Sequence, residues 1–137
     1  MTQEGICAHP DFGKRILEFR DFVHRKEQMY DDSGHGTHVA GILAGDGRLS
    51  GGTYAGIAPK ASLLIAKVLD QDGNGSVESV LEGMRWVLSM RKKYPIRVVN
   101  ISVGAKPNLE QKQKKRLILG AESLWICRDY LYRSHAA

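Results

Sequence analysis

The chain has 137 residues, of which 42% are hydrophobic and 26% are charged, and its formal net charge is +5 at pH 7. This length and composition suit one folded domain and exclude a disordered chain, and no apolar run approaches the ~18 residues of a membrane span. The positive charge is dispersed except in the segment 112–116 (Lys-Gln-Lys-Lys-Arg), which is typical of a solvated helix face and predicts no nucleic-acid partner and no membrane partner.

The first residues and the cysteines bear on the compartment. Residues 1–5 lack the charged and apolar regions of a signal peptide. We therefore expect a cytoplasmic protein as the sequence is written, and a secreted one if an upstream signal has been lost. Cys7 and Cys127 form neither a disulfide framework nor a Cys-x-x-Cys ligand pair, so two free thiols are expected.

Residues 11–30 are rich in charge and carry scattered aromatic side chains. This pattern predicts a surface connection that contains one or two short strands. No residue of this segment suggests a chemical role.

Residues 31–45 (Asp-Asp-Ser-Gly-His-Gly-Thr-His-Val-Ala-Gly-Ile-Leu-Ala-Gly) predict a short helix that begins at Asp32 and Ser33. The small side chains within it favour a helix buried on most sides. His35 and His38 are three residues apart and therefore share one face. They can pack in a core, bind a metal ion or take part in acid–base chemistry. The zinc pattern His-Glu-x-x-His requires a spacing of four and a glutamate, and the segment has neither.

Further elements follow in the second half of the chain. Residues 62–69 form an apolar run of strand length, and the helical spacing of apolar residues over 77–94 predicts a helix that Ser76 can cap. Residues 96–103 predict the next strand, and 108–124 predict another helix. Strand, helix and strand in this order form a right-handed βαβ unit, so the fold class is α/β with a parallel β-sheet flanked by helices.

The loop 70–81 raises an alternative, a calcium-binding protein of the EF-hand type. Its first, third and fifth positions are Asp, Asp and Asn, and its sixth is Gly, as the EF-hand pattern requires. The twelfth position should be a glutamate but is Leu81, and Glu82 stands one residue late. A strand also precedes the loop where an EF-hand needs a helix. We therefore predict no metal ion and no other cofactor.

The run 35–41 (His-Gly-Thr-His-Val-Ala-Gly) resembles the histidine motif of the subtilisin-like serine proteases, the subtilases or peptidase S8 family. Residues 5–12 resemble the segment that follows the family's aspartate motif, and residues 55–59 resemble the segment that precedes a core strand. We therefore interpret residues 1–125 as a partial subtilase catalytic domain with a partial subtilisin-like fold. Residues 126–137 are interpreted as a divergent tail.

The resemblance implies a serine-type endopeptidase in which His35 is the catalytic general base. In that family the histidine takes the proton of a serine hydroxyl and returns it to the leaving amine. The resemblance also implies two backbone edges between which a substrate lies as an added strand, held by main-chain hydrogen bonds. The implied substrate-binding residues are Gly73, Asn74, Gly75, Ser102, Val103 and Gly104.

Other parts of the family's machinery are absent from the sequence. Gln3 stands where the catalytic aspartate belongs, and glutamine cannot supply the charge that stabilises the imidazolium. The Ala-Ala-Gly-Asn oxyanion motif and the Gly-Thr-Ser nucleophile motif do not occur. We therefore expect the chain to be inactive alone.

Three hypotheses remain open at this point. The first is a truncated or frameshifted piece of a protease gene, whose partners are a peptide or protein substrate and the remainder of the protease domain. The second is a non-catalytic fragment that binds a peptide or a partner, and the third is the calcium-binding protein. In the first two, a parallel sheet with unpaired strand edges predicts poor solubility.

Overall fold

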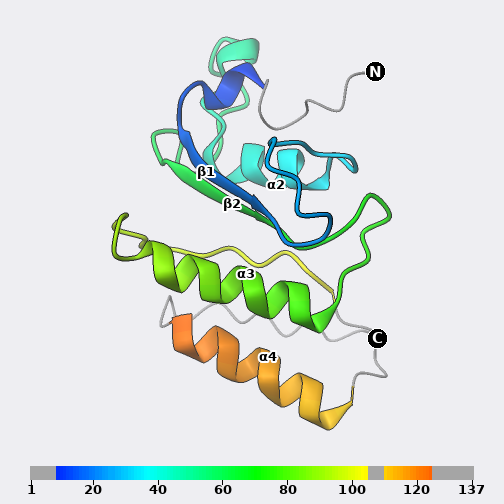
Figure 1. The fold of residues 1–137 in the computed structure, drawn as a ribbon. Helices are drawn as coiled ribbons and strands as arrows, with labels where there is room; N and C mark the ends of the chain where they lie inside the picture. Colours follow the sequence, from blue (N-terminus) through cyan, green and yellow to red (C-terminus); the bar gives the residue numbers. More distant parts are fainter. Residues whose placement is uncertain (1–8, 105–109, 125–137) are drawn as a thin grey trace, which may run out of the picture. The chain divides into compact units, whose positions relative to one another are not determined.

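A computed structural model describes residues 9–104 and 110–124 of the chain (Figure 1). Two compact units meet within helix α3, one ending at Gly83 and the other beginning at Met84. Predictions that concern Gln3, Cys7, Cys127 and the tail 126–137 lie outside the described residues. In chain order the elements are η1 (Pro10–Phe12), β1 (Ile16–Asp21), α2 (His35–Ala44), η2 (Arg48–Ser50), β2 (Leu63–Lys67), α3 (Val77–Met90) and α4 (Gln111–Leu124).

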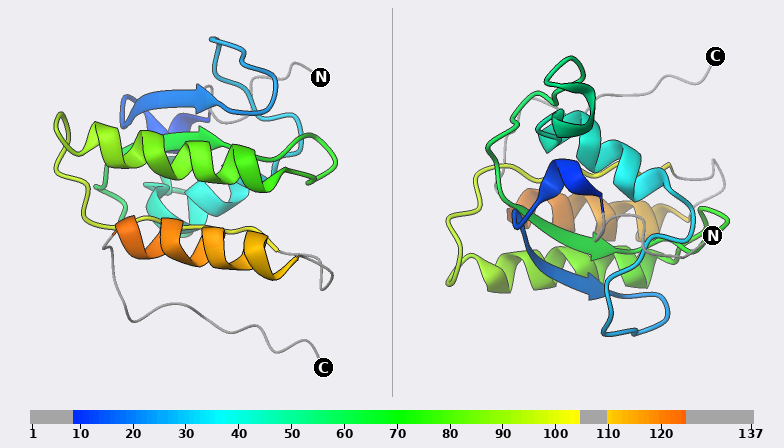
Figure 2. Two further views of the ribbon diagram at one scale, coloured as in Figure 1. Left: turned by 60° about the horizontal axis from the view of Figure 1, so that its bottom comes forward. Right: turned by 90° about the horizontal axis from the view of Figure 1, so that it is seen from above.

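The sheet of the described residues consists of β1 and β2, which run parallel (Figure 2). Phe19 lies opposite Ile65, and Asp21 lies opposite Lys67. The predicted strand at 62–69 and the parallel sheet are confirmed. The interpretation of residues 11–30 is confirmed in its short strand, β1, and is wrong in that the segment is more than a surface connection, because β1 pairs with β2.

The predicted strand at 96–103 is also wrong, since residues 95–104 contain neither helix nor strand. Ile101 is 43% exposed and Val98 is 68% exposed. Alternating apolar residues favour a strand only where a neighbouring strand accepts their backbone hydrogen bonds, and no described strand pairs with this segment. The βαβ unit expected around α3 is therefore not formed among the described residues.

The best-buried part of the first unit lies on one face of the sheet. Phe12 and Ala40 are 1% and 4% exposed, and Ile16, Met29, Leu63 and Ile65 pack against them. Helix α2 thus covers this face through Ala40. The prediction that α2 is buried on most sides is wrong, because Ala40 packs on the sheet while Ile42 on another side of the helix is exposed.

The start of α3 covers the other face of the sheet (Figure 2). Ala66 alternates with Ile65 along β2, so the two side chains point to opposite faces. A Cβ atom built on Gly83 of α3 would lie 3.6 Å from the Cβ of Ala66, which shows how closely the helix approaches the strand. The predicted cap of this helix is confirmed, because the Ser76 Oγ accepts a hydrogen bond from the amide of Ser79 at 3.0 Å.

Arg15, at the start of β1, fixes the far end of α2. Its Nη1 donates to the carbonyl of Ala44 at 2.6 Å and to the carbonyl of Ala61 at 2.9 Å, and its Nη2 donates to the carbonyl of Asp11. One guanidinium therefore satisfies carbonyl groups of three segments, including the last helical residue of α2. The other end of α2, its first turn, is not held by Arg15 and depends on other contacts.

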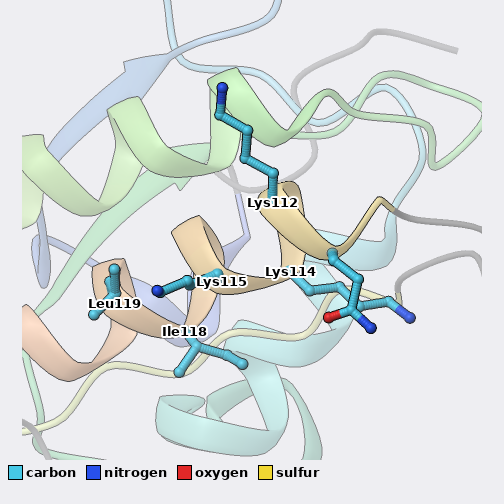
Figure 3. Close-up of a pocket in the computed structure, with 6 residues that line it drawn as sticks. Lys112, Lys114, Lys115, Ile118 and Leu119 are labelled. Atoms are coloured by element: carbon cyan, nitrogen blue, oxygen red, sulfur yellow. The ribbon is translucent and has the colours of Figure 1, made fainter.

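In the second unit, α4 confirms the helix predicted over 108–124 (Figure 3). Its lysines Lys112, Lys114 and Lys115 share a surface with Ile118 and Leu119, which are 56% and 51% exposed. The segment 112–116 is thus a helix face that is mostly solvated, as predicted. Among the described helices, none combines the length and the apolar character needed to cross a bilayer.

Candidate active site

His35 is the first residue of α2 and is exposed. Its amide donates a hydrogen bond to the Ser33 Oγ at 3.3 Å. His38 is also exposed, and its amide donates to the carbonyl of Gly34 at 3.0 Å. An imidazole at the exposed first turn of a helix can reach a substrate that approaches from solvent, so core packing does not account for either histidine.

The turn that carries His35 is held by the carboxylate of Asp31. Asp31 Oδ2 accepts hydrogen bonds from the Thr37 amide at 2.7 Å and the Thr37 hydroxyl at 2.5 Å. Asp31 Oδ1 accepts from the amides of Gly34 at 2.9 Å and Ser33 at 3.3 Å. Burial by itself raises the pKa of Asp31, but these hydrogen bonds outweigh it, so the pKa lies below its ordinary value.

The helix begins differently from the sequence prediction, which named Asp32 and Ser33. Gly34 is the N-cap residue, in a left-handed conformation with φ 79°, and it has no side chain that could cap. Asp31 supplies the capping acceptor for the amide of Thr37 instead. A glycine at this position lets the chain turn sharply between Asp31 and the helix.

Asp32 points to the sheet rather than to the helix. Its Oδ1 forms an ion pair with the Nζ of Lys67 at 2.7 Å, and the two side chains are 8% and 10% exposed. Lys67 is the last residue of β2, and its Nζ also donates to the carbonyl of Leu69 at 2.6 Å. The histidine turn (residues 31–37) is therefore joined to the carboxyl end of β2, where the loop with Gly73, Asn74 and Gly75 begins.

The loop after β2 is closed by Asp70. The amide of Asp70 donates to the carbonyl of Asn74 at 2.7 Å, and the Asp70 Oδ1 accepts from the amides of Asp72 at 2.9 Å and Asn74 at 2.8 Å. The amide of Gly73 also donates to the carbonyl of Asp70 at 3.2 Å. The amide and the carbonyl of Asn74 are therefore both engaged within the loop.

Gly75 itself has no room for a side chain. A Cβ atom built there would overlap the carbonyl oxygen of Val68 and would lie 2.7 Å from the Leu69 Cδ2. The loop backbone at Gly75 is exposed and packs closely on the end of β2. Glycine is therefore required by packing at this position, whether or not a peptide binds.

The same geometry disfavours an EF-hand in the loop 70–81. The carboxylate of Asp70 is directed to amides of its own loop, and Glu82 forms an ion pair with Arg25 at 2.6 Å. No group of three or more His, Cys, Asp or Glu side chains suited to a metal ion occurs within the described ranges. The carboxylates of Asp70 and Glu82 thus have partners within the protein.

Ser102, Val103 and Gly104 belong to the second unit, whereas His35 and Gly73–Gly75 belong to the first. The three residues are exposed, and the Ser102 Oγ accepts a hydrogen bond from the Asn100 Nδ2 at 2.8 Å. The structure thus brings together the histidine turn and the carboxyl end of β2 by direct contacts. Ser102–Gly104, the second predicted substrate edge, is an exposed segment of the second unit.

Comparison with known proteins identifies the family. The family model described as "Subtilase family" matches residues 4–126. The chain belongs to the subtilase family. This confirms the resemblance inferred from the histidine motif and agrees with an α/β fold in which a parallel sheet is flanked by helices.

Individual subtilases give the same result. The serine protease AprX of Bacillus subtilis is 38% identical over 129 residues, which are 91% of this chain and 29% of AprX. Subtilisin BL of Lederbergia lenta is 37% identical over 101 residues, or 74% of this chain and 35% of that protein. A crystal structure of a cold-adapted subtilisin-like serine proteinase superposes with a TM-score of 0.66 at 26% identity, covering 86% of this chain and 39% of that one.

The chain therefore spans between 29% and 39% of the length of these relatives. Two further similar proteins, both of Bacillus subtilis, are named the major intracellular serine protease and the minor extracellular protease Epr. Subtilases similar to this chain thus occur on both sides of the membrane. The sequence prediction missed Asp31 and Lys67, and only the paired acids before the histidine motif hinted at the first of them.

Proposed function

We propose that this subtilase chain is part of a serine endopeptidase and supplies its general base, His35. The observation that carries the proposal is the exposed His35 at the first turn of α2, within a full histidine motif and on a turn fixed by Asp31. A base must be held in one orientation and still be open to substrate. The Asp31 contacts hold the backbone of this turn, and the exposure of His35 leaves it open to a substrate.

In the proposed reaction, a ring nitrogen of His35 removes the proton of a serine hydroxyl as the serine attacks the peptide carbonyl. The imidazolium then gives this proton to the leaving amine. The substrate backbone pairs as an added strand, and the residues proposed to bind it are Gly73–Gly75 and Ser102–Gly104. Gly75 contributes an exposed backbone at the end of β2.

The serine of this reaction comes from outside the 137 residues, which contain no Gly-Thr-Ser sequence. Catalysis without members of the triad depends on the oxyanion site and on substrate binding, and the Ala-Ala-Gly-Asn motif is not present either. The 137-residue polypeptide alone is therefore proposed to be inactive. Its substrates are peptides or proteins in extended conformation.

A second candidate is a fragment that binds a peptide or a partner without catalysis. It is favoured by the close-packed, exposed backbone at Gly75, which needs neither an aspartate nor a serine to pair with a peptide. Peptide binding without hydrolysis in a complete domain would single out this candidate.

The experiment uses AprX as the source of the remaining residues. In a chimera, the AprX segment that matches residues 9–104 is replaced by residues 9–104 of this chain, and hydrolysis of an unstructured protein is measured. The proposal predicts a chimera that cleaves the substrate and a 137-residue chain that does not. A folded chimera that binds the substrate but leaves it intact would contradict the proposed protease.

A further inference from the structure

Lys67 has an unusual set of contacts for a residue at the end of a strand. Its ammonium is buried with Asp32, donates to the carbonyl of Leu69 and lies 5.1 Å from the centroid of the Tyr30 ring. A buried ammonium loses much hydration free energy, and it is tolerated only where several partners replace water. Here a carboxylate, a carbonyl and an aromatic face take that place.

These partners belong to segments that flank the proposed site. Asp32 lies three residues before His35, and Leu69 lies immediately before the loop that Asp70 closes. One ammonium group therefore contacts both the turn that carries the proposed base and the strand end from which the proposed peptide edge begins. Both segments belong to the first unit, in which β1 and β2 form the scaffold.

Asp31 and Asp32 both hold the turn, Asp31 through local hydrogen bonds and Asp32 through a contact with β2. The Asp31 carboxylate binds the amides of Ser33, Gly34 and Thr37, so it fixes the shape of the turn and not its place on the sheet. The Asp32 carboxylate reaches Lys67, which is 35 residues later in the sequence. Of these two carboxylates, the one that contacts β2 is therefore that of Asp32.

We propose that Asp32 and Lys67 are positioning residues, whose buried ion pair sets the place of His35 relative to the peptide-binding backbone at Gly73–Gly75. The proposal rests on the function proposed above, since it concerns the same site. Neither residue is catalytic, because each acts through the segment that it holds. A buried ion pair adds little net stability and fixes geometry more effectively, which suits such a role.

The pair is tested in the full 137-residue chain with three variants. Lys67→Met removes the ammonium and leaves the Asp32 carboxylate unpaired. The double variant Lys67→Met with Asp32→Leu removes both charges and so relieves the unpaired one. The matched control is Arg25→Met with Glu82→Gln, which removes an ion pair of similar length, 2.6 Å, that is far more exposed.

Hydrogen exchange read by mass spectrometry gives the first readout, at low protein concentration. In Lys67→Met we expect much faster exchange of the amides in 31–37 and 70–76 and a smaller acceleration in β1, because the unpaired carboxylate also lowers the global stability. The double variant should recover the global stability of the native chain and keep the fast local exchange, because the tie is still missing. If exchange in both segments returns to the native rate in the double variant, or if β1 and α3 accelerate equally in both variants, the pair is only a structural contact and the proposal is overturned.

The second readout is the affinity for a fluorescein-labelled, alanine-rich hexapeptide, measured by anisotropy. Loss of the Asp32–Lys67 ion pair should weaken binding about tenfold in both Lys67 variants and leave binding by the control unchanged. If the native chain does not bind the peptide, only the proposed peptide site is contradicted. The positioning role is still tested by hydrogen exchange, which does not use the peptide. Equal affinity in all variants, with native binding intact, would overturn the positioning role.

Discussion

The Tyr30 hydroxyl donates a hydrogen bond to the Asp21 Oδ2 at 2.7 Å, which joins the residue before the histidine turn to the last residue of β1. Asp21 is 2% exposed and also accepts bonds from the amides of Val23, His24 and Lys26. The segment between β1 and the histidine turn thus closes around one buried carboxylate.

Replacing Tyr30 by Phe should destabilise the chain, because it removes a donor to a buried charge. We expect the free energy of unfolding at pH 7 to fall by about 1.5 to 3 kcal/mol. Urea unfolding measures the change, and Tyr54→Phe serves as the control because Tyr54 is 81% exposed. An unchanged unfolding midpoint in Tyr30→Phe would show that water replaces the lost hydroxyl.

The same contact predicts how stability depends on alkaline pH. Burial and the hydrogen bond to Asp21 raise the pKa of Tyr30 far above its ordinary value. The protonated phenol is favoured in the folded state, so its contribution is complete below the unfolded pKa of about 10 and is lost as pH rises above it. The free energy of unfolding should therefore fall between about pH 10 and 11.5 in the native chain and fall less steeply in Tyr30→Phe. Parallel slopes in the two proteins would contradict this assignment.

Asp31 predicts an acid-sensitive cap on α2. Replacing it by Ala should lower the free energy of unfolding by about 1 to 2 kcal/mol, since Thr37 loses its acceptor. The depressed pKa of Asp31 contributes stability above the unfolded pKa of about 3.9, and this contribution is lost as pH falls through the lower folded value. The cost of Asp31→Ala should thus be full at pH 6 and shrink below about pH 4. Asp72→Ala, at an exposed loop position, is the control, and an equal cost for both variants would argue against the cap.

The elements that the sequence predicted well are those determined locally. The cap of α3 by Ser76 depends on residues within one turn, and the apolar run of β2 is continuous. The candidate base was predicted in the same way, since the motif around His35 is contiguous. Local patterns of this kind need no knowledge of distant contacts.

The failures arise where a partner decides the structure. A short strand was expected within residues 11–30, but the charged Glu18 and Arg20 gave no sign that this strand pairs with β2 in the sheet. Residues 96–103 have the alternation of a strand, but no described strand accepts their hydrogen bonds. Lys67 was not predicted as part of the site, because its contact with Asp32 joins positions 35 residues apart.

The exposed apolar residues of α4 predict self-association of the chain. Ile118 and Leu119 are exposed on its surface, with Leu119 beside Lys115 (Figure 3), and exposed apolar groups are stabilised by contact with another apolar surface. Light scattering should show assemblies that grow with protein concentration, and Ile118→Lys with Leu119→Lys should reduce them. Gln111→Lys controls for the added charge on the same helix. A monodisperse monomer of the native chain over the concentration range would contradict this prediction.

The central claim is that His35, and not its neighbour His38, is the general base of a subtilase. The direct measurement is kcat/KM for peptide hydrolysis in the AprX chimera with His35→Ala and with His38→Ala, two exposed histidines of one helix that serve as matched variants. We predict a loss of about 10⁶-fold for His35→Ala, the size found when the histidine of the subtilisin triad is removed, with a change below about tenfold for His38→Ala. Comparable activity of the two variants, or a greater loss on replacing His38, would contradict the assignment of His35.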